Sequence, residues 1–272
     1  MTAPQPKSAA EWARRALLNI VGVLDAQADS LTVVGGQAVA IRTAGLDALD
    51  LETSDGDLAV TPALVATAPS LEALLLDAGY ERRTEARPGL WGRERYEDRY
   101  GTTQYREKID LSVARALSGS ADPRKRSVPA LVAHGRMTTN NASGLELATV
   151  DRSPVRISDL VDPDHSATVH AAGHAALMIG KSFKITDRLT ARATGPVRDK
   201  DYGDLWRLAA TADEDAVRTA VRLGLAQPTI TTAVSEGVRR AVRSLSLEGA
   251  ARATAAFGDT IDNERIRDDF TR

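Results

Sequence analysis

Two short apolar segments constrain this sequence most: the first ends at a glycine pair, and the second begins with two acids. The first segment runs into Val33–Ala38 (VVGGQA), and the second follows Thr53 in the run Thr53–Val60 (TSDGDLAV). This pattern predicts a strand, a Gly-Gly turn, a helix from Gln37, and a second strand that carries Asp55 and Asp57. Strands and helices in this order favour an α+β fold.

These residue types suit a nucleotide–metal site. Side chains two apart in a strand share a face, so Asp55 and Asp57 project together at a spacing suited to a divalent metal. Glycine lets the backbone at Gly35 and Gly36 pass close to a ligand, and the helix from Gln37 would point free N–H groups at phosphate. The Asp-x-Asp pair or the Gly-Gly pair alone is also typical of an ordinary turn. Only the order and spacing of the two motifs favour a nucleotide–metal site.

Composition excludes several classes of protein. The 272 residues include no cysteine, so disulfides and thiolate metal sites are excluded. No apolar run approaches the ~18 residues of a membrane span, and the polar start is unlike a signal peptide. We therefore expect a cytoplasmic protein without a membrane partner. The net charge of −2 gives no global attraction to nucleic acid, so such binding needs local patches.

The pattern changes from helical to strand-like at Tyr80. Helical spacing predicts a helix over Glu11–Ala28 and a helical region from Pro62 to Leu76. Aromatic and basic residues alternate between Tyr80 and Asp110, as expected of strands with one exposed face. The last of these strands carries Asp110, which is costly to bury unless it binds a metal or a partner. An exposed position on an alternating strand is the other interpretation.

The remaining sequence predicts a second domain. We expect a turn at Pro123–Arg126 and two short strands within Gly144–Ile157, followed from Ser166 by helices. The domains would span residues 1–160, an α/β domain, and residues 161–272, a mostly helical domain. In that helical interpretation His170 and His174 lie one turn apart; without a third ligand they are ordinary helix positions.

Two charged segments of the second half are expected to converge. Lys181, Lys184 and Arg188 share one face of a helix, and Asp201 and Asp204 lie three apart on another. A lysine beside nucleotide phosphates offsets the charge that builds up during transfer, and the acids would hold it in place. A solvated pair of salt-bridged helices is the alternative.

The ordered set of these motifs resembles the AbiEii/MenT family, which are toxins of bacterial toxin–antitoxin systems with a polymerase-β-like nucleotidyltransferase fold. The resemblance rests on Gly35–Ala38, then Thr53–Leu58, then the lysine-rich helix, then Lys200–Leu205 (KDYGDL). It implies an N-terminal nucleotidyltransferase mixed sheet flanked by helices and a C-terminal mostly helical domain. The sequence departs from the family pattern at Leu51, where arginine is usual, and at Gly56, where a branched apolar residue is usual.

The resemblance also implies roles for individual residues. Catalysis would fall to Asp57, Lys181 and Asp201, and a Mg²⁺ or Mn²⁺ ion would be held by Asp55, Asp57 and Asp110. The nucleotide, an NTP, would be bound by a further set, which is Gly35, Gly36, Lys181, Lys184 and Asp204. Lys184 competes with Lys181 for the catalytic position.

The implied reaction transfers NMP from the NTP to the 3′ end of tRNA, which blocks aminoacylation and translation, and a cognate antitoxin protein would be a partner. Between Arg82 and Lys108 basic residues outnumber acidic ones and alternate with aromatic side chains able to stack on bases. Transfer to a protein or small molecule, or a degenerate nucleotide-binding module acting through a partner, are the alternatives.

Overall fold

A computed structural model describes residues 4–46, 53–120, 122, 128–190, 198–258 and 261–271. The chain divides into two compact units. The first comprises Met1–Gln37, Glu52–Ala142 and Ser153–Ala171, and the second comprises Ala38–Leu51, Ser143–Arg152 and Ala172–Arg272.

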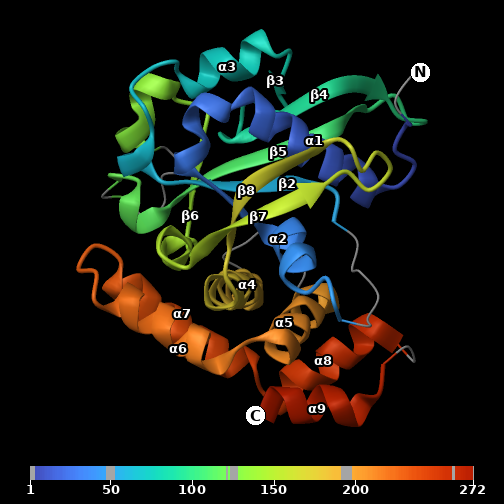
Figure 1. Cartoon of the computed structure of the whole chain (residues 1–272), viewed down its shortest axis with the longest axis vertical. Coiled ribbons are helices and arrows are strands. Elements are labelled where there is room, and N and C mark those ends of the chain that lie inside the picture. The colour runs from blue at the N-terminus through green and yellow to red at the C-terminus, as the bar shows by residue number, and fades with distance from the viewer. Residues whose placement is uncertain are drawn as a thin grey trace. The chain divides into compact units, whose positions relative to one another are not determined.

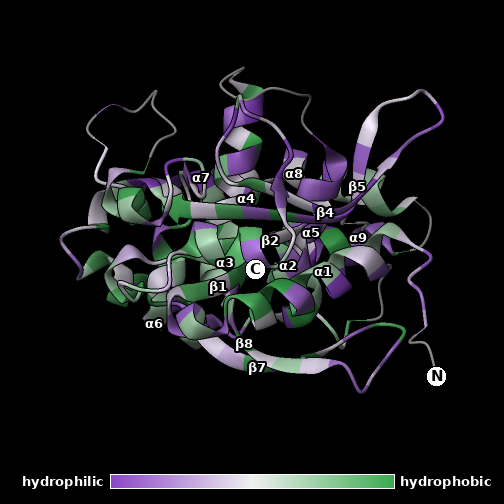
Figure 2. Ribbon diagram, turned by 90° about the horizontal axis from the view of Figure 1, so that it is seen from above, coloured by the Kyte–Doolittle hydropathy of each residue, from purple (hydrophilic) through white to green (hydrophobic). Residues whose placement is uncertain are grey.

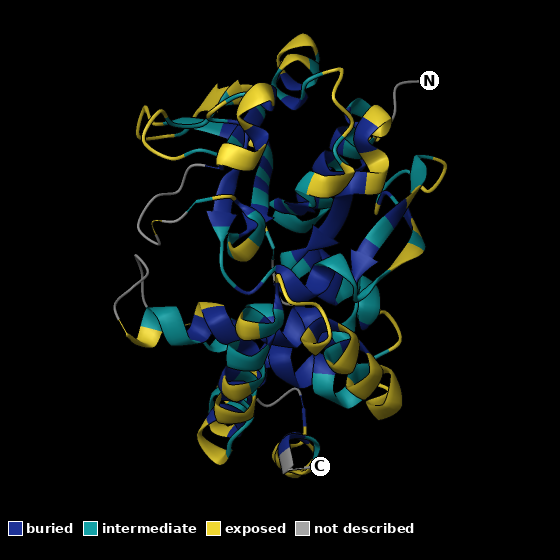
Figure 3. Cartoon of the chain, turned by 90° about the vertical axis from the view of Figure 1, so that its left-hand side faces the viewer, coloured by how far each residue is buried: buried dark blue, intermediate teal, exposed yellow. Residues whose placement is uncertain are grey.

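The first unit is built on a mixed sheet whose described part has eight strands (Figure 1). In spatial order the strands are β3 (Glu81–Arg82), β4 (Leu90–Glu97), β5 (Thr103–Ala114), β2 (Gly56–Val60), β1 (Leu31–Val34), β8 (Ser166–Ala172) and β7 (Arg152–Ser158), and β6 (Asn140–Ala142) pairs with β5. Strand β2 runs parallel to β5 and antiparallel to β1. Strand β1 in turn runs parallel to β8. The central strands are mostly buried, as the dark blue arrows of Figure 3 show.

Helix α1 (Ala9–Val23) begins at a capping box, in which Glu11 N donates to Ser8 Oγ at 3.2 Å and Ser8 N donates to Glu11 Oε2 at 3.0 Å. Its buried face, which includes Leu17 and Ile20, packs against β5 and β2. The other helical segments that begin in this unit are η1 (Asp25–Ser30), α2 (Gly35–Arg42), η2 (Pro62–Leu64), α3 (Leu71–Asp77), η3 (Arg115–Leu117) and η4 (Pro129–His134). From Ala38 onward α2 belongs to the second unit.

The described residues of the second unit form helices joined by turns and short loops, apart from one end residue each of β7 and β8. Its segments are η5 (Glu146–Thr149), α4 (His174–Leu189), α5 (Asp199–Thr211), α6 (Glu214–Leu225), α7 (Thr231–Ser244), α8 (Leu247–Phe257) and α9 (Asn263–Thr271). In its core the Trp206 and Phe257 rings meet edge to face at 5.0 Å. The indole Nε1 of Trp206 donates to Asp269 Oδ2 at 3.0 Å, so this buried donor is satisfied.

The expected fold class is confirmed: a mixed sheet flanked by helices precedes a mostly helical C-terminal region. The predicted strands at residues 31–34 and 56–60 are also confirmed. Among the described helices, none is long and apolar enough to cross a membrane.

Several expected elements are wrong in extent or type. The first helix ends at Val23, where a 3₁₀ segment replaces the expected continuation to Ala28. The glycine pair forms the first turn of α2 and does not precede it. The segment Ser166–Ala172, expected to be helical, is strand β8, so His170 lies on a strand and not one helical turn before His174. Of the two strands expected within Gly144–Ile157, one formed as β7, while residues 146–149 are a 3₁₀ helix. The turn at Pro123–Arg126 and Leu51 lie outside the described residues.

Candidate active site

Three acids of the first unit, Asp55, Asp57 and Asp110, form what we call the acid cluster. The parallel register of β2 and β5 pairs Asp57 directly with Asp110. Asp55 comes one residue before β2 begins. Residues that pair across neighbouring strands project from the same face of a sheet. The structure therefore brings the three side chains together, although Asp55 and Asp110 are 55 positions apart in the sequence.

The glycine pair makes room for this cluster. Gly35 has φ +65°, and a Cβ on it would overlap Asp57 Oδ2. A Cβ on Gly36 would lie 2.7 Å from Thr53 Oγ1. A side chain at either position would therefore overlap a neighbour. Because both positions are glycine, the start of α2 can lie against Asp57 and Thr53.

An arginine lies against the acid cluster. Arg83 Nη1 donates to Asp110 Oδ1 at 3.2 Å and lies 3.9 Å from Asp55 Oδ1. The same Asp55 Oδ1 is buried and accepts no hydrogen bond from any described residue. A buried acceptor without a donor is costly, so the cluster has an open ligand position.

The acids also repel one another. Burial, followed by the charges of Asp57 and Asp55, raises the pKa of Asp110 to about 7, although Arg83 opposes the change. Arg87 opposes the change as well. Three acids thus face two arginines, and a further cation would be attracted to the cluster.

The donor set of the cluster suits a hard divalent cation. In the described part of the chain, no group of three or more His, Cys, Asp or Glu side chains is arranged to hold a metal ion by itself. Mg²⁺ does not require such a group, because it is usually held by one or two carboxylates together with water and substrate phosphates. The oxygen ligands Asp55 and Asp57, with the open Oδ1 atom, fit this mode of binding.

The second unit holds the other predicted residues, which we call the lysine cluster. Lys181, in the middle of α4, is buried and donates through Nζ to Asp204 Oδ2. It also lies 3.6 Å from Asp201 Oδ1. Both acids are on α5, three residues apart, and both are buried. The expected convergence of the α4 lysine and the α5 acids is present within this unit.

More cations than acids make up the lysine cluster. Asp201 accepts from Arg188 and lies 3.6 Å from Lys184 Nζ. Lys200 Nζ donates to Asp204 Oδ2 at 3.4 Å. Burial raises the pKa of Asp201, but Lys181, Lys184 and Arg188 lower it by more, so this carboxylate stays ionised. Among the described contacts, four cations face these two carboxylates, and this excess of positive charge suits phosphate.

The two competing lysines differ in environment. The Lys181 side chain is 6% exposed, whereas that of Lys184 is 50% exposed. Lys181 is therefore fixed by its ion pairs, while Lys184 is free to turn toward solvent. This difference favours Lys181 as the positioned cation and Lys184 as a supplementary contact for an anionic ligand.

Sequence reasoning missed two members of these clusters. Arg83 belongs to an arginine-rich stretch in which no spacing distinguishes it from its neighbours, and only the fold brings it to the acids. Lys200 had a usable signal, since Lys200 and Asp204 are four residues apart on one helix and such pairs interact. The acid cluster belongs to the first unit and the lysine cluster to the second.

Comparison with known proteins adds little. No family model matches the chain, and no curated protein matches it. Among solved structures, the chain is similar to an antigenic nucleotidyltransferase-like protein from Paracoccidioides brasiliensis, with a TM-score of 0.43 and 15% sequence identity. The similarity covers 85% of this chain and 95% of that chain. Such a similarity carries no argument about function, which has to come from the residues of the two clusters.

Proposed function

We propose that this protein is a metal-dependent nucleotidyltransferase that transfers NMP from an NTP to an acceptor hydroxyl. One observation carries the proposal: Asp55 Oδ1 is buried without a hydrogen-bond donor among the described residues, in a cluster where three acids face Arg83 and Arg87. A divalent cation would satisfy this oxygen and neutralise the cluster. The first turn of α2, with Gly35 and Gly36, lies beside it and offers backbone N–H groups to a triphosphate.

Asp55 and Asp57 would hold the metal, and Asp110 would complete the set once Arg83 moves aside. Bound there, Mg²⁺ or Mn²⁺ would lower the pKa of the acceptor hydroxyl and neutralise charge on the triphosphate. Arg83, released from the acids, would be available to the phosphates. It can approach a phosphate with two parallel N–H groups.

The lysine cluster supports the same function through its net positive charge. Lys181 would offset negative charge on the phosphates during transfer, and Asp204 and Asp201 would hold its ammonium in place. Its action on the same nucleotide as Asp55 and Asp57 stays a prediction, because the residues belong to different units. Lys184 and Asp204 would serve nucleotide binding.

For the acceptor we propose the 3′ end of tRNA, with the protein acting as the toxin of a toxin–antitoxin system and an antitoxin as its partner. The far end of the β4–β5 hairpin supports a nucleic-acid acceptor, because it is strongly hydrophilic (Figure 2) and carries exposed basic and aromatic side chains such as Arg95, Tyr96 and Arg106.

A nucleotide-binding module without transfer is the second candidate. It is favoured by Arg83, which lies where a metal would be needed, and by Gly56, which weakens the strand between the two acids.

The test is a transfer assay with purified protein, each α-labelled NTP, Mg²⁺ or Mn²⁺ and bulk tRNA. We expect label on tRNA, and Asp57→Asn should lower the rate by about 100-fold or more, the effect of removing one charge-stabilising group. Asp77→Asn is the matched control, because Asp77 is an exposed acid of α3 in the same unit. Full activity of Asp57→Asn would refute the site, and NTP binding without turnover on any acceptor would select the second candidate.

A further inference from the structure

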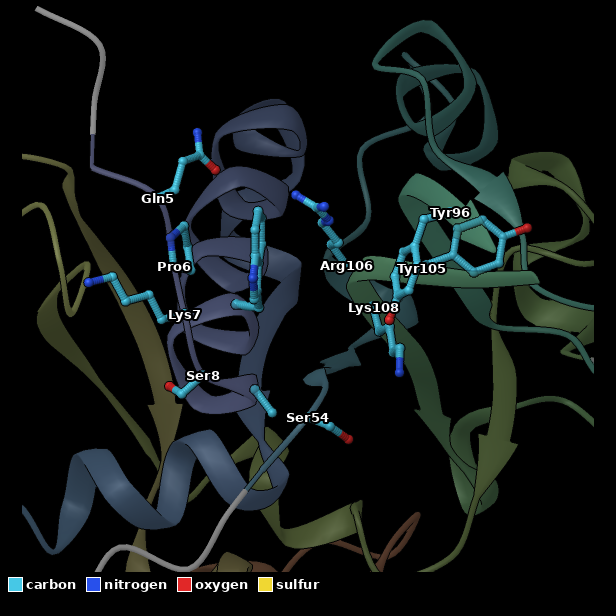
Figure 4. Close-up of a pocket in the computed structure, with 11 residues that line it drawn as sticks. Gln5, Pro6, Lys7, Ser8, Ser54, Tyr96, Tyr105, Arg106 and Lys108 are labelled. Atoms are coloured by element: carbon cyan, nitrogen blue, oxygen red, sulfur yellow. The ribbon is translucent and has the colours of Figure 1, made fainter. Parts of the chain in front are cut away.

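A groove of about 570 Å³ opens in the first unit, beside the start of α1 (Figure 4). Its lining comes from the segment before α1, from α1 itself, from β4 and β5, and from the residue before Asp55. The lining residues are Gln5, Pro6, Lys7, Ser8, Ala9, Trp12, Ser54, Tyr96, Tyr105, Arg106 and Lys108.

The lining has one sign of charge and three aromatic side chains. Lys7, Arg106 and Lys108 are basic, and no acid lines the groove. The Arg106 guanidinium lies 5.5 Å from the Trp12 ring and 5.8 Å from the Tyr96 ring. Arg106 thus makes cation–π contacts with two rings of this groove, and Figure 4 shows it on the inner side of the lining. This combination suits a ligand that has flat rings and negative charge.

Two residues of the groove lining are close neighbours of the acid cluster along the chain. Ser54 is in the lining and directly precedes Asp55. Lys108 and Asp110 lie two residues apart on β5, so their side chains share a face with Cα atoms about 7 Å apart. A chain-like ligand bound in the groove would therefore extend to the acids.

We propose that this groove binds an unpaired nucleotide segment of a nucleic acid chain. Bases would stack on Trp12 and Tyr96, and the basic side chains would contact the phosphates. The volume is that of a small-ligand pocket, which admits unstacked bases, whereas a duplex keeps its bases stacked inside. The role as an acceptor groove rests on the proposed function, but the binding itself does not.

The experiment uses the full chain without NTP or metal. Trp12 is partly exposed, whereas Trp91 and Trp206 are both 0% exposed, so quenching of tryptophan fluorescence reports on the groove. We expect an eight-nucleotide single-stranded RNA to quench this fluorescence and a blunt RNA duplex not to. Trp12→Phe should remove the quenching while anisotropy of a labelled RNA still reports binding.

Two substitutions measure the contributions of the lining. Trp12→Ala should weaken binding of the labelled RNA by about 5- to 150-fold, the range for loss of one stacked base. Arg106→Ala should weaken it and lower the salt slope by about 0.7, as expected for one lost phosphate contact on a single strand. Arg136→Ala, at an exposed arginine of the same unit outside the groove, should change the affinity less than about twofold.

The outcomes separate this inference from the proposed function. Groove-dependent RNA binding together with failed nucleotide transfer would remove the proposed function and leave the groove standing. Transfer to RNA with a KM unchanged in Trp12→Ala and Arg106→Ala would overturn the groove instead. Equal affinity for duplex and single strand would also overturn it. If Trp12→Ala does not fold, Trp12→Phe and Arg106→Ala decide the question.

Discussion

Lys181 is a buried ammonium group whose stability depends on Asp204 and Asp201. Taking a charge out of water is costly unless the pairing is close, and here the buried carboxylates also face Lys184, Lys200 and Arg188. Each carboxylate therefore has more than one cation beside it. Loss of an acid and loss of a lysine should have unequal effects.

We predict that Asp204→Asn lowers the free energy of unfolding by about 3–5 kcal/mol, as expected when one partner of a buried ion pair is removed. Lys181→Met should cost at least about 1 kcal/mol less, because it reduces the positive excess and leaves Lys200 beside Asp204. Urea denaturation of both variants measures the difference. A larger loss in Lys181→Met than in Asp204→Asn would contradict the charge count of this cluster.

For single residues, the sequence predicted which acids lie side by side more reliably than which cations contact them. The short spacing of Asp55 and Asp57, and of Asp201 and Asp204, required only a strand and a helix to bring each pair together. Arg83 depends on a hairpin that returns it to Asp110, and no periodic pattern contains that information.

Close helix packing in the second unit depends on glycine. Gly237 on α7 faces Ile179 on α4, and a Cβ at Gly237 would lie 2.5 Å from Ile179 Cγ2. Alanine favours a helix over glycine by about 1 kcal/mol, but overpacking a buried contact costs about 1–3 kcal/mol. The packing effect is the larger of the two at this crossing.

We predict that Gly237→Ala lowers the free energy of unfolding by up to about 2 kcal/mol in urea denaturation, the overpacking cost less the helix gain. Gly22→Ala is the control, because Gly22 is also helical and a Cβ there meets nothing within 4 Å. That variant should gain up to about 1 kcal/mol. Adding Ile179→Ala to Gly237→Ala should cost less than the sum of the two single changes, and simple additivity would exclude the steric explanation.

The sequence predicted correctly those helices and strands whose hydrophobic pattern fits only one type of secondary structure. Strand β1 (LTVV) is a short apolar run that ends at a glycine, and β2 (GDLAV) is a short apolar run that carries Asp57 near its start. Strand β8 (SATVHAA) was missed because it contains small residues that suit a helix equally well, and its pairing with β1 decides its type. Tertiary pairing overrides local preference there.

Both units contain a carboxylate that links stability to pH. In the first unit Asp159 accepts from Arg15 Nε at 2.7 Å and from Val161 N at 2.8 Å. Burial raises its pKa, but the hydrogen bonds from Arg15 and the backbone lower it by more, so the net pKa is lowered. In the second unit the pKa of Asp201 is lowered by its cations. A lowered carboxylate pKa stabilises the folded state above the unfolded value of about 3.9.

We therefore predict that both units lose stability as the pH falls below about 4, through the folded pKa values of these two acids. Asp159→Asn should destabilise the protein at pH 7 and reduce the stability difference between pH 7 and pH 3. Unfolding midpoints measured across this pH range test the prediction. An unchanged pH dependence in Asp159→Asn would show that this ion pair does not contribute to acid sensitivity.

Strand β1, in the middle of the sheet, joins distant parts of the chain. It pairs with β2 on one side and, through Val33 and Ala171, with β8 on the other. During synthesis β1, β2 and β5 emerge long before β8. A nascent chain that stops short of Ala171 therefore exposes unpaired backbone groups of β1, which are a template for association with other chains. Truncated products of this gene should for that reason be prone to aggregation inside the cell.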